Sequence, residues 1–161
     1  MVDRNSTPII IDGDILEVST GIIAHQVNCQ GAIGAGVSGV ICKQYPKVYE
    51  RYKFAFERYV LESFRPVSCL LGLVDVIPVS GTLKVANIFS QLHYGNSSKT
   101  GKVYTYMDKL IGGLEKIRKD YPDDVIYVPY KIGCGLAGGD WDEFMQKAKD
   151  IPNLIVIRKE K

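Results

Sequence analysis

The stretch GIIAHQVNCQGAIGAGVSGVI, residues 21–41, decides the fold of this chain. It opens with an apolar run that predicts a buried strand over Gly21–Asn28, because polar and apolar residues do not alternate between Ile22 and Ala24. A cluster of small residues follows at 31–36, and a helix is expected from about Val37 to Gln44. A strand, a glycine loop and a helix start together offer backbone N–H groups to an anion. We therefore predict that a phosphate-bearing ligand binds at this loop.

The bulk properties suit a single domain over residues 1–161 with one hydrophobic core. The net charge of +2 is too small to indicate nucleic-acid binding by itself. No apolar run approaches the roughly 18 to 20 residues that cross a membrane, and the N-terminus lacks the apolar stretch of a signal peptide. We expect a cytoplasmic monomer without membrane association.

The cysteines and histidines do not form a metal-binding pattern. The four cysteines, Cys29, Cys42, Cys69 and Cys134, contain no C-x-x-C pair, and His93 is the only histidine besides His25. The usual spacing of a zinc site is therefore absent. Reduced thiols are expected, with neither a metal nor a cofactor.

The rest of the chain alternates predicted strands and helices. Strands are expected at 9–11, 68–78, 83–91, 125–129 and 154–157, and helices after Pro46, from Thr105 and from Asp140. The strands at 68–78 and 83–91 are joined by a tight polar turn that predicts an antiparallel hairpin. A polar loop at 93–101 is long enough to act as a mobile flap. The pattern predicts an α/β fold with a mixed sheet of about six strands and helices on both faces.

A second glycine cluster, residues 132–139, also follows a buried strand and precedes a helix. If the two strands are neighbours, both glycine loops lie at one edge of the sheet and can grip a diphosphate. Gly34, Gly36 and Gly39 match the dinucleotide pattern G-x-G-x-x-G, but the region 20 residues on is a helix, where a Rossmann unit needs a strand ending in an acidic residue. Cys134 lacks the following arginine of a cysteine phosphatase, which favours a packing role.

Three candidate residues have a structural interpretation beside the functional one. Asp14 fits a turn residue, because it follows Asp12-Gly13. His25 fits a core histidine whose hydrogen bonds are satisfied inside a buried strand. Asp140 fits the N-cap of a helix, because Glu143 stands three residues later as in a capping box. Both interpretations of each residue stay open.

Five motifs resemble those of the macro domain family. They are HQVNCQG at 25–31, GAGV at 34–37, YP at 45–46, NIF at 87–89 and PYKIGCGLAGGDW at 129–141. The resemblance covers essentially the whole chain and is strongest to the ADP-ribose 1''-phosphate phosphatases and the terminal ADP-ribose glycohydrolases. It implies a three-layer αβα fold that binds ADP-ribose, or ADP-ribose 1''-phosphate, across the top of the sheet.

The resemblance also implies a set of ligand-binding residues. Asp14 would receive the adenine amino group, Asn28 would hold the distal ribose, and the two glycine loops would cradle the phosphates through their amides. The implied set is Gly13, Asp14, Ile15, Gln26, Val27, Asn28, Ile33, Gly34, Ala35, Gly36, Val37, Ser38, Ser90, Ile132, Gly133, Cys134, Gly135, Leu136 and Ala137.

The resemblance names His25 and Asp140 as the catalytic candidates of a phosphatase. The glycohydrolase branch would need a lysine after the strand 86–91 and an aspartate after Gly-Cys-Gly-Leu, whereas this chain has Ser90-Gln91 and Ala137. Three functions therefore stay open. They are a phosphatase acting on ADP-ribose 1''-phosphate, a hydrolase that removes ADP-ribose from protein or nucleic acid, and a module that binds ADP-ribose without turnover.

Overall fold

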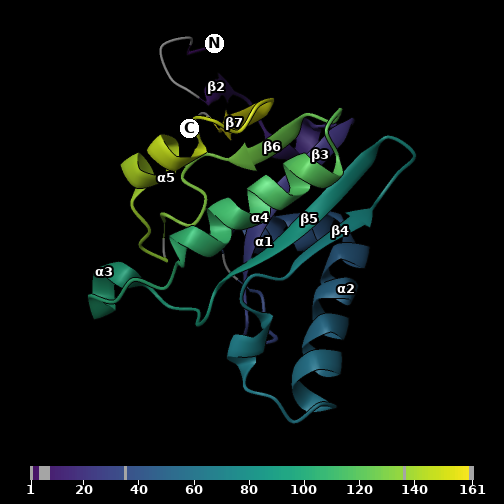
Figure 1. Ribbon diagram of the computed structural model, residues 1–161, viewed down its shortest axis with the longest axis vertical. Helices are drawn as coiled ribbons and strands as arrows, with labels where there is room; N and C mark the ends of the chain where they lie inside the picture. The colour runs from purple at the N-terminus through teal and green to yellow at the C-terminus, as the bar shows by residue number, and fades with distance from the viewer. Residues whose placement is uncertain (1, 4–7, 35, 136, 160–161) are drawn as a thin grey trace.

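A seven-stranded mixed sheet forms the centre of the molecule (Figure 1). The computed structural model describes residues 2–3, 8–34, 36–135 and 137–159. The strands are β1 (Val2–Asp3), β2 (Ile9–Asp12), β3 (Gly21–Asn28), β4 (Val74–Pro78), β5 (Leu83–Gln91), β6 (Ile126–Pro129) and β7 (Leu154–Arg158). Their spatial order is β1-β2-β7-β6-β3-β5-β4, and only the two edge pairings, β1 with β2 and β4 with β5, are antiparallel. The predicted six strands are all present, and the seventh is the two-residue β1.

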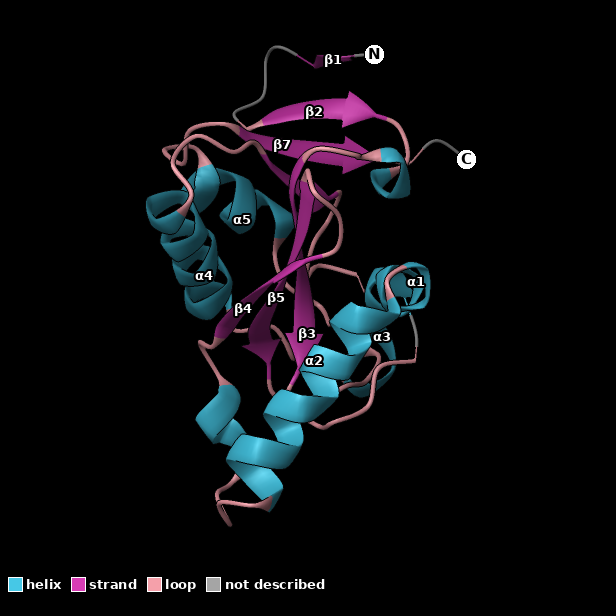
Figure 2. Cartoon of the chain, turned by 90° about the vertical axis from the view of Figure 1, so that its right-hand side faces the viewer, coloured by secondary structure: helices cyan, strands magenta, loops and turns pink. Residues whose placement is uncertain are grey.

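Helices cover both faces of the sheet, as Figure 2 shows. The helices are α1 (Gly36–Gln44), α2 (Pro46–Phe56), α3 (Ser97–Thr100), α4 (Met107–Asp120) and α5 (Trp141–Ala148). The helices α4 and α5 pack on the face that carries Ile22 and Ala24 of β3, whereas α1 and α2 pack on the face that carries Ile23. Successive side chains of a strand point to opposite faces, so β3 contributes side chains to the hydrophobic cores on both sides of the sheet. The predicted three-layer αβα fold is confirmed.

The predicted strand at 68–78 is wrong over its first half. Val67–Leu70 forms a 3-10 helix, and β4 begins only at Val74. Backbone hydrogen bonds between residues three apart, such as Cys69 N to Pro66 O at 3.0 Å, close local turns in this segment. Gly72 then adopts a φ of +94°, which an extended strand cannot accommodate. The antiparallel hairpin of β4 and β5 is confirmed.

The boundaries of two further elements differ from the prediction. The helix expected from Thr105 begins at Met107, because Thr105 pairs with Gln91 in an isolated antiparallel bridge. The helix after Pro46 does not continue regularly to Val60 but ends in a π-helical segment, Glu57–Leu61. The loop expected at 93–101 contains the short helix α3. Among the described residues, no helix is both long and apolar enough to cross a membrane.

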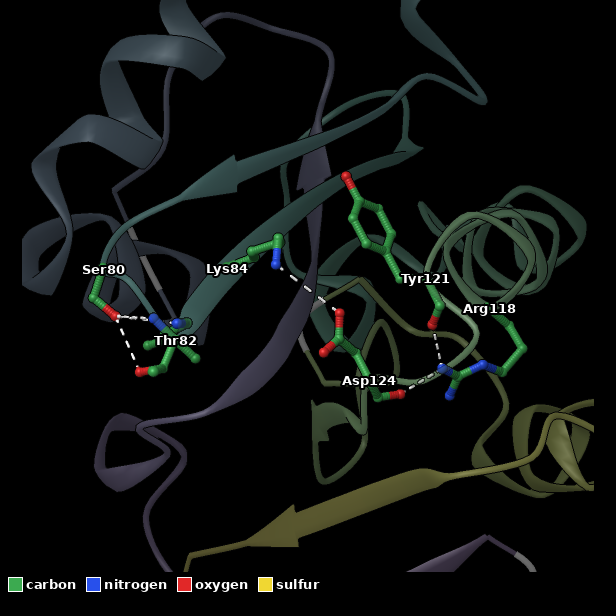
Figure 3. A network of polar contacts seen from close by, with 7 residues as sticks. Ser80, Thr82, Lys84, Arg118, Tyr121 and Asp124 are labelled. Carbon is green, nitrogen blue, oxygen red and sulfur yellow. Dashed lines mark hydrogen bonds and ion pairs between the residues drawn. The ribbon is translucent and has the colours of Figure 1, made fainter.

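At the end of the sheet opposite the glycine loops, Arg118 ties α4 to the turn that follows it (Figure 3). Its guanidinium donates to the carbonyl oxygens of Tyr121 and Asp124, and also to Pro152 O at 3.0 Å. The Asp124 carboxylate lies 4.0 Å from the Lys84 ammonium on β5. These contacts fix the N-terminal ends of β6 and β7 and leave the opposite ends of the strands for the site.

Candidate functional site

A cavity of about 740 Å³ lies at the carboxyl ends of β3 and β6. These two parallel strands are neighbours, with Ile22 opposite Ile126, so the two glycine loops emerge at the same edge of the sheet. Open α/β sheets bind ligands at this edge. The described lining residues are His25, Gln26, Val27, Asn28, Ala32, Ile33, Gly34, Gly36, Val37, Ser38, Gln91, Tyr94, Gly95, Asn96, Pro129, Tyr130, Lys131, Ile132, Gly133, Gly135 and Ala137.

The first loop joins the end of β3 to α1 and forms one wall. Asn28 holds its shape, because its side-chain nitrogen donates to Ala32 O at 2.9 Å and its side-chain oxygen accepts from the Tyr52 hydroxyl at 2.7 Å. The chain enters α1 through Gly36, whose φ of +73° strongly favours glycine. The first amides of a helix have no acceptor within it, so those of Val37 and Ser38 are available to an anion in the cavity.

His25 lies beneath the first loop and is only 1% exposed. Its Nε2 lies 2.5 Å from the side-chain oxygen of Asn87, and its Nδ1 lies 3.0 Å from the Ser38 hydroxyl. The Asn87 nitrogen donates to Val48 O, so its oxygen faces the ring and Nε2 carries the proton of the neutral imidazole. Burial lowers the pKa of His25 from 6.5 to about 4 despite the hydrogen bond to Asn87. His25 is therefore neutral at pH 7. Its Nε2 donates to Asn87, and its Nδ1 lies against the Ser38 hydroxyl, which donates to Gln26 O at 2.5 Å.

The side chain of Gln26 lies on the other face of β3 and connects the strand to the second glycine loop. Its side-chain nitrogen donates to Thr105 Oγ1 at 2.9 Å, and its side-chain oxygen accepts from the Ser90 hydroxyl at 2.7 Å. The Thr105 hydroxyl in turn donates to Gly133 O at 2.5 Å. Adjacent residues of one strand, His25 and Gln26, thus connect β3 to the first and the second glycine loop respectively.

The second loop is built from two overlapping turns. Ile132 N donates to Pro129 O at 3.0 Å, and Cys134 N donates to Lys131 O at 2.8 Å. The third residue of each turn has a positive φ, +59° at Lys131 and +69° at Gly133. The amides of Gly133 and Gly135 donate to no acceptor among the described residues, and both residues line the cavity. This wall therefore also presents free N–H groups.

A third wall comes from the segment between β5 and α4. Tyr94, Gly95 and Asn96 line the cavity, and Tyr94 is 63% exposed. The segment is fixed to the second loop because Tyr104 N donates to Ala137 O at 2.7 Å. A Cβ on Gly138 would also clash with the Ser97 hydroxyl, so the two segments are in close contact. The sequence indicated a loop in this region but not its position beside the glycine loops.

The structure brings most of the predicted site residues together and leaves others outside. Gln26, Val27, Asn28 and the described residues of both loops line the cavity, except Cys134, and His25 lines it as well. Gly13, Asp14, Ile15 and Ser90 are not among the lining residues. Ala35 and Leu136 lie outside the described residues. Ser90 is fully buried beneath the cavity, and its hydroxyl donates to the side-chain oxygen of Gln26.

Asp14 and Asp140 both act as helix caps in this structure. The Asp14 carboxylate accepts from Leu16 N at 2.9 Å at the start of a 3-10 helix, Ile15–Glu17, and lies 3.7 Å from the Lys159 ammonium. Asp140 is exposed and accepts from the amides of Asp142 and Glu143 at the start of α5. Asp140 does not line the cavity, so its placement favours the structural interpretation.

Cys134 is placed as a packing residue. Burial raises the pKa of its thiol to about 11, and the Asp140 carboxylate adds to this shift. Its sulfur donates to Ile132 O at 3.2 Å. A thiol with this pKa is a poor nucleophile at neutral pH.

No group of three or more potential metal ligands occurs among the described histidine, cysteine, aspartate and glutamate side chains.

Sequence reasoning missed part of the lining. The missed residues are Ala32, Gln91, Tyr94, Gly95, Asn96, Pro129, Tyr130 and Lys131. Ala32, Pro129, Tyr130 and Lys131 stand directly before the predicted loop segments, so extending each segment by a few residues would have found them. Gln91 and residues 94–96 required knowledge of how the β5–α4 segment folds back.

Comparison with solved structures identifies this architecture. The macrodomain of Mycobacterium tuberculosis DarG superposes with a TM-score of 0.70 at 20% identity, covering 94% of this chain and 97% of that one. Thermosipho africanus DarTG in complex with ADP-ribose superposes with a TM-score of 0.70 at 18% identity, covering 94% of this chain and 41% of that one. The chain has the macrodomain fold.

Among curated proteins, the chain is similar to the ADP-ribose 1''-phosphate phosphatase of Meyerozyma guilliermondii. The two sequences are 29% identical, and the alignment covers 91% of this chain and 97% of the relative. The relative therefore aligns along nearly its full length. No protein-family model matches the chain.

Proposed function

We propose that this protein binds ADP-ribose in the cavity and hydrolyses ADP-ribose 1''-phosphate to ADP-ribose and phosphate. The observation that carries the proposal is a cavity of about 740 Å³ lined by both glycine loops, which present amides that have no acceptor among the described residues. Backbone N–H groups of this kind bind phosphate groups. The name of the Meyerozyma guilliermondii relative and the ADP-ribose complex of a structural neighbour support this choice of ligand.

The diphosphate would lie between the two loops. The Val37 and Ser38 amides would bind one phosphate from the start of α1, and the Gly133 and Gly135 amides would bind the other. Asn28 would contact the distal ribose, as the resemblance implies, without leaving the hydrogen bonds that shape the first loop. The contact of the adenine amino group with Asp14 remains a prediction, because Asp14 stands apart from the lining.

The proposed reaction is attack of water on the terminal phosphorus with cleavage of the P–O bond to the ribose. The ribose oxygen leaves with a proton, so ADP-ribose and inorganic phosphate are the products. The loop amides would stabilise the negative charge that develops on the phosphoryl oxygens. His25 is the first catalytic candidate to test, since it lines the cavity and reaches Ser38, whereas Asp140 is the second.

A second candidate function is binding of ADP-ribose without turnover. It is favoured by the placement of the two catalytic candidates. The His25 ring is held between Asn87 and Ser38, and Asp140 caps α5 outside the cavity lining. The glycine loops alone are sufficient for this function.

One experiment separates the candidates. The protein is incubated with ADP-ribose 1''-phosphate and with an ADP-ribosylated protein, and free phosphate and free ADP-ribose are followed. Release of phosphate from the first substrate supports the phosphatase, and release of ADP-ribose from the second supports the hydrolase. Calorimetric binding of ADP-ribose with neither product supports the binding module, and absence of binding contradicts the whole proposal. His25→Ala and Asp140→Ala, assayed separately, assign their roles, and His93→Ala serves as the control at the exposed histidine.

A further inference from the structure

Lys131 is the one described residue of the cavity lining with a charged side chain at neutral pH. The remaining lining side chains are apolar or uncharged, since the low pKa of the buried His25 keeps its ring neutral. Lys131 is exposed and forms no ion pair with a described carboxylate. Its ammonium lies 5.8 Å from the centre of the Tyr130 ring. The Tyr130 ring packs against Trp141 in a T-shaped arrangement with the ring centroids 5.1 Å apart, so the lysine extends from a packed support.

The backbone at Lys131 is unusual for a residue with a side chain. Lys131 is the third residue of the turn closed by Ile132 N and Pro129 O, and its φ is +59°. The next turn has the same geometry and places Gly133, with a φ of +69°, at the equivalent position. A positive φ is strained for a non-glycine residue, and such strain is concentrated at functional sites. The loop therefore has a lysine where its backbone favours glycine.

We infer that Lys131 is a specificity-determining residue that binds a phosphate group of the ligand and favours ligands carrying a phosphate monoester. This inference rests on the proposed function. Amides attract phosphate as dipoles, whereas an ammonium adds a full positive charge whose effect increases with the charge of the ligand. A terminal phosphate monoester adds up to two negative charges to ADP-ribose. The charge of Lys131 therefore contributes more to binding of ADP-ribose 1''-phosphate than to binding of ADP-ribose.

The test measures binding of both ligands and thermal stability in the same set of variants. Lys131→Gly removes the charge and relieves the backbone, whereas Lys131→Gln removes the charge and keeps the strain. Both variants are expected to bind ADP-ribose 1''-phosphate about tenfold more weakly, with a smaller loss for ADP-ribose and a weaker dependence on salt. The glycine variant alone is expected to melt about 2–4 °C higher. Lys131→Arg should retain the preference for the monoester.

Two matched controls separate charge from strain. Phe64→Gly relieves another positive φ, +53°, at a residue outside the cavity lining, so it should raise the melting temperature without changing affinity. Lys147→Gln removes an exposed lysine of α5 that pairs with Glu143, and it should leave both affinities unchanged. Unchanged affinities in Lys131→Gly and Lys131→Gln, with a wild-type chain that binds both ligands, would overturn the role of Lys131. A wild-type chain that binds neither ligand would overturn the proposed function itself and this inference with it.

Discussion

The buried histidine gives this protein a specific dependence of stability on pH. In the unfolded chain His25 titrates near 6.5, whereas in the folded protein burial lowers its pKa to about 4. Between these values the unfolded state binds more protons than the folded state, so the free energy of unfolding decreases as the pH falls through 6.5 toward 4. Well above pH 6.5 the ring is neutral in both states and contributes no slope.

The size of the effect follows from the shift. One pKa unit corresponds to about 1.4 kcal/mol, so lowering the pH from 7.5 to 4.5 should remove roughly 2–3 kcal/mol of stability through His25 alone. Solvent screens this effect little, because the His25 side chain is 1% exposed. Relative to a total stability of about 5–15 kcal/mol, such a loss is readily measured.

The assay is urea unfolding followed by circular dichroism at several pH values from 7.5 to 4.5. His25→Gln should be less stable than wild type at pH 7.5, because Asn87 and Ser38 lose their partner, but its stability should fall less steeply with acidification. His93→Gln is the matched control, since His93 is exposed and its change should leave the slope at the wild-type value. Equal slopes for His25→Gln and wild type would refute the argument that a neutral, buried imidazole underlies the first loop.

Three further predictions concern packing and thiol chemistry. Gly112→Ala should stabilise α4 by about 1 kcal/mol, because a Cβ there meets no atom within 4 Å. Gly113→Ala should instead destabilise the protein by about 1–3 kcal/mol, because its Cβ would lie 2.6 Å from a methyl group of β5. The melting temperatures of the two variants should therefore shift in opposite directions. Arg118→Ala should cost about 1–3 kcal/mol in urea unfolding, since several carbonyl oxygens lose a charged donor. Alkylation by iodoacetamide at pH 7.5, followed by mass spectrometry, should modify the exposed Cys69 well before Cys134, whose thiol pKa is about 11; faster labelling of Cys134 would contradict the packing role assigned to it.

The local pattern was sufficient for the elements with strong hydrophobic periodicity. The strand at 21–28, the helix of α4 and the N-cap at Asp140 follow from residues close in sequence, and they occur as predicted apart from small shifts in their ends. The segment at 68–71 has equally apolar residues but forms turns closed by local hydrogen bonds after Pro66, and pairing to β5 begins only where Gly72 N donates to Phe89 O. Apolar composition alone does not distinguish these outcomes.

By itself, the sequence determined the α/β class, the two glycine loops and their exit from buried strands, because these depend on spacing and on the special backbone freedom of glycine. Only the tertiary structure decided which side chains reach the site. It placed β3 beside β6, directed His25 and Gln26 to opposite faces of one strand, and brought residues 94–96 to the cavity. These are contacts between residues distant in sequence, and they are fixed by strand order and burial, which no local pattern encodes.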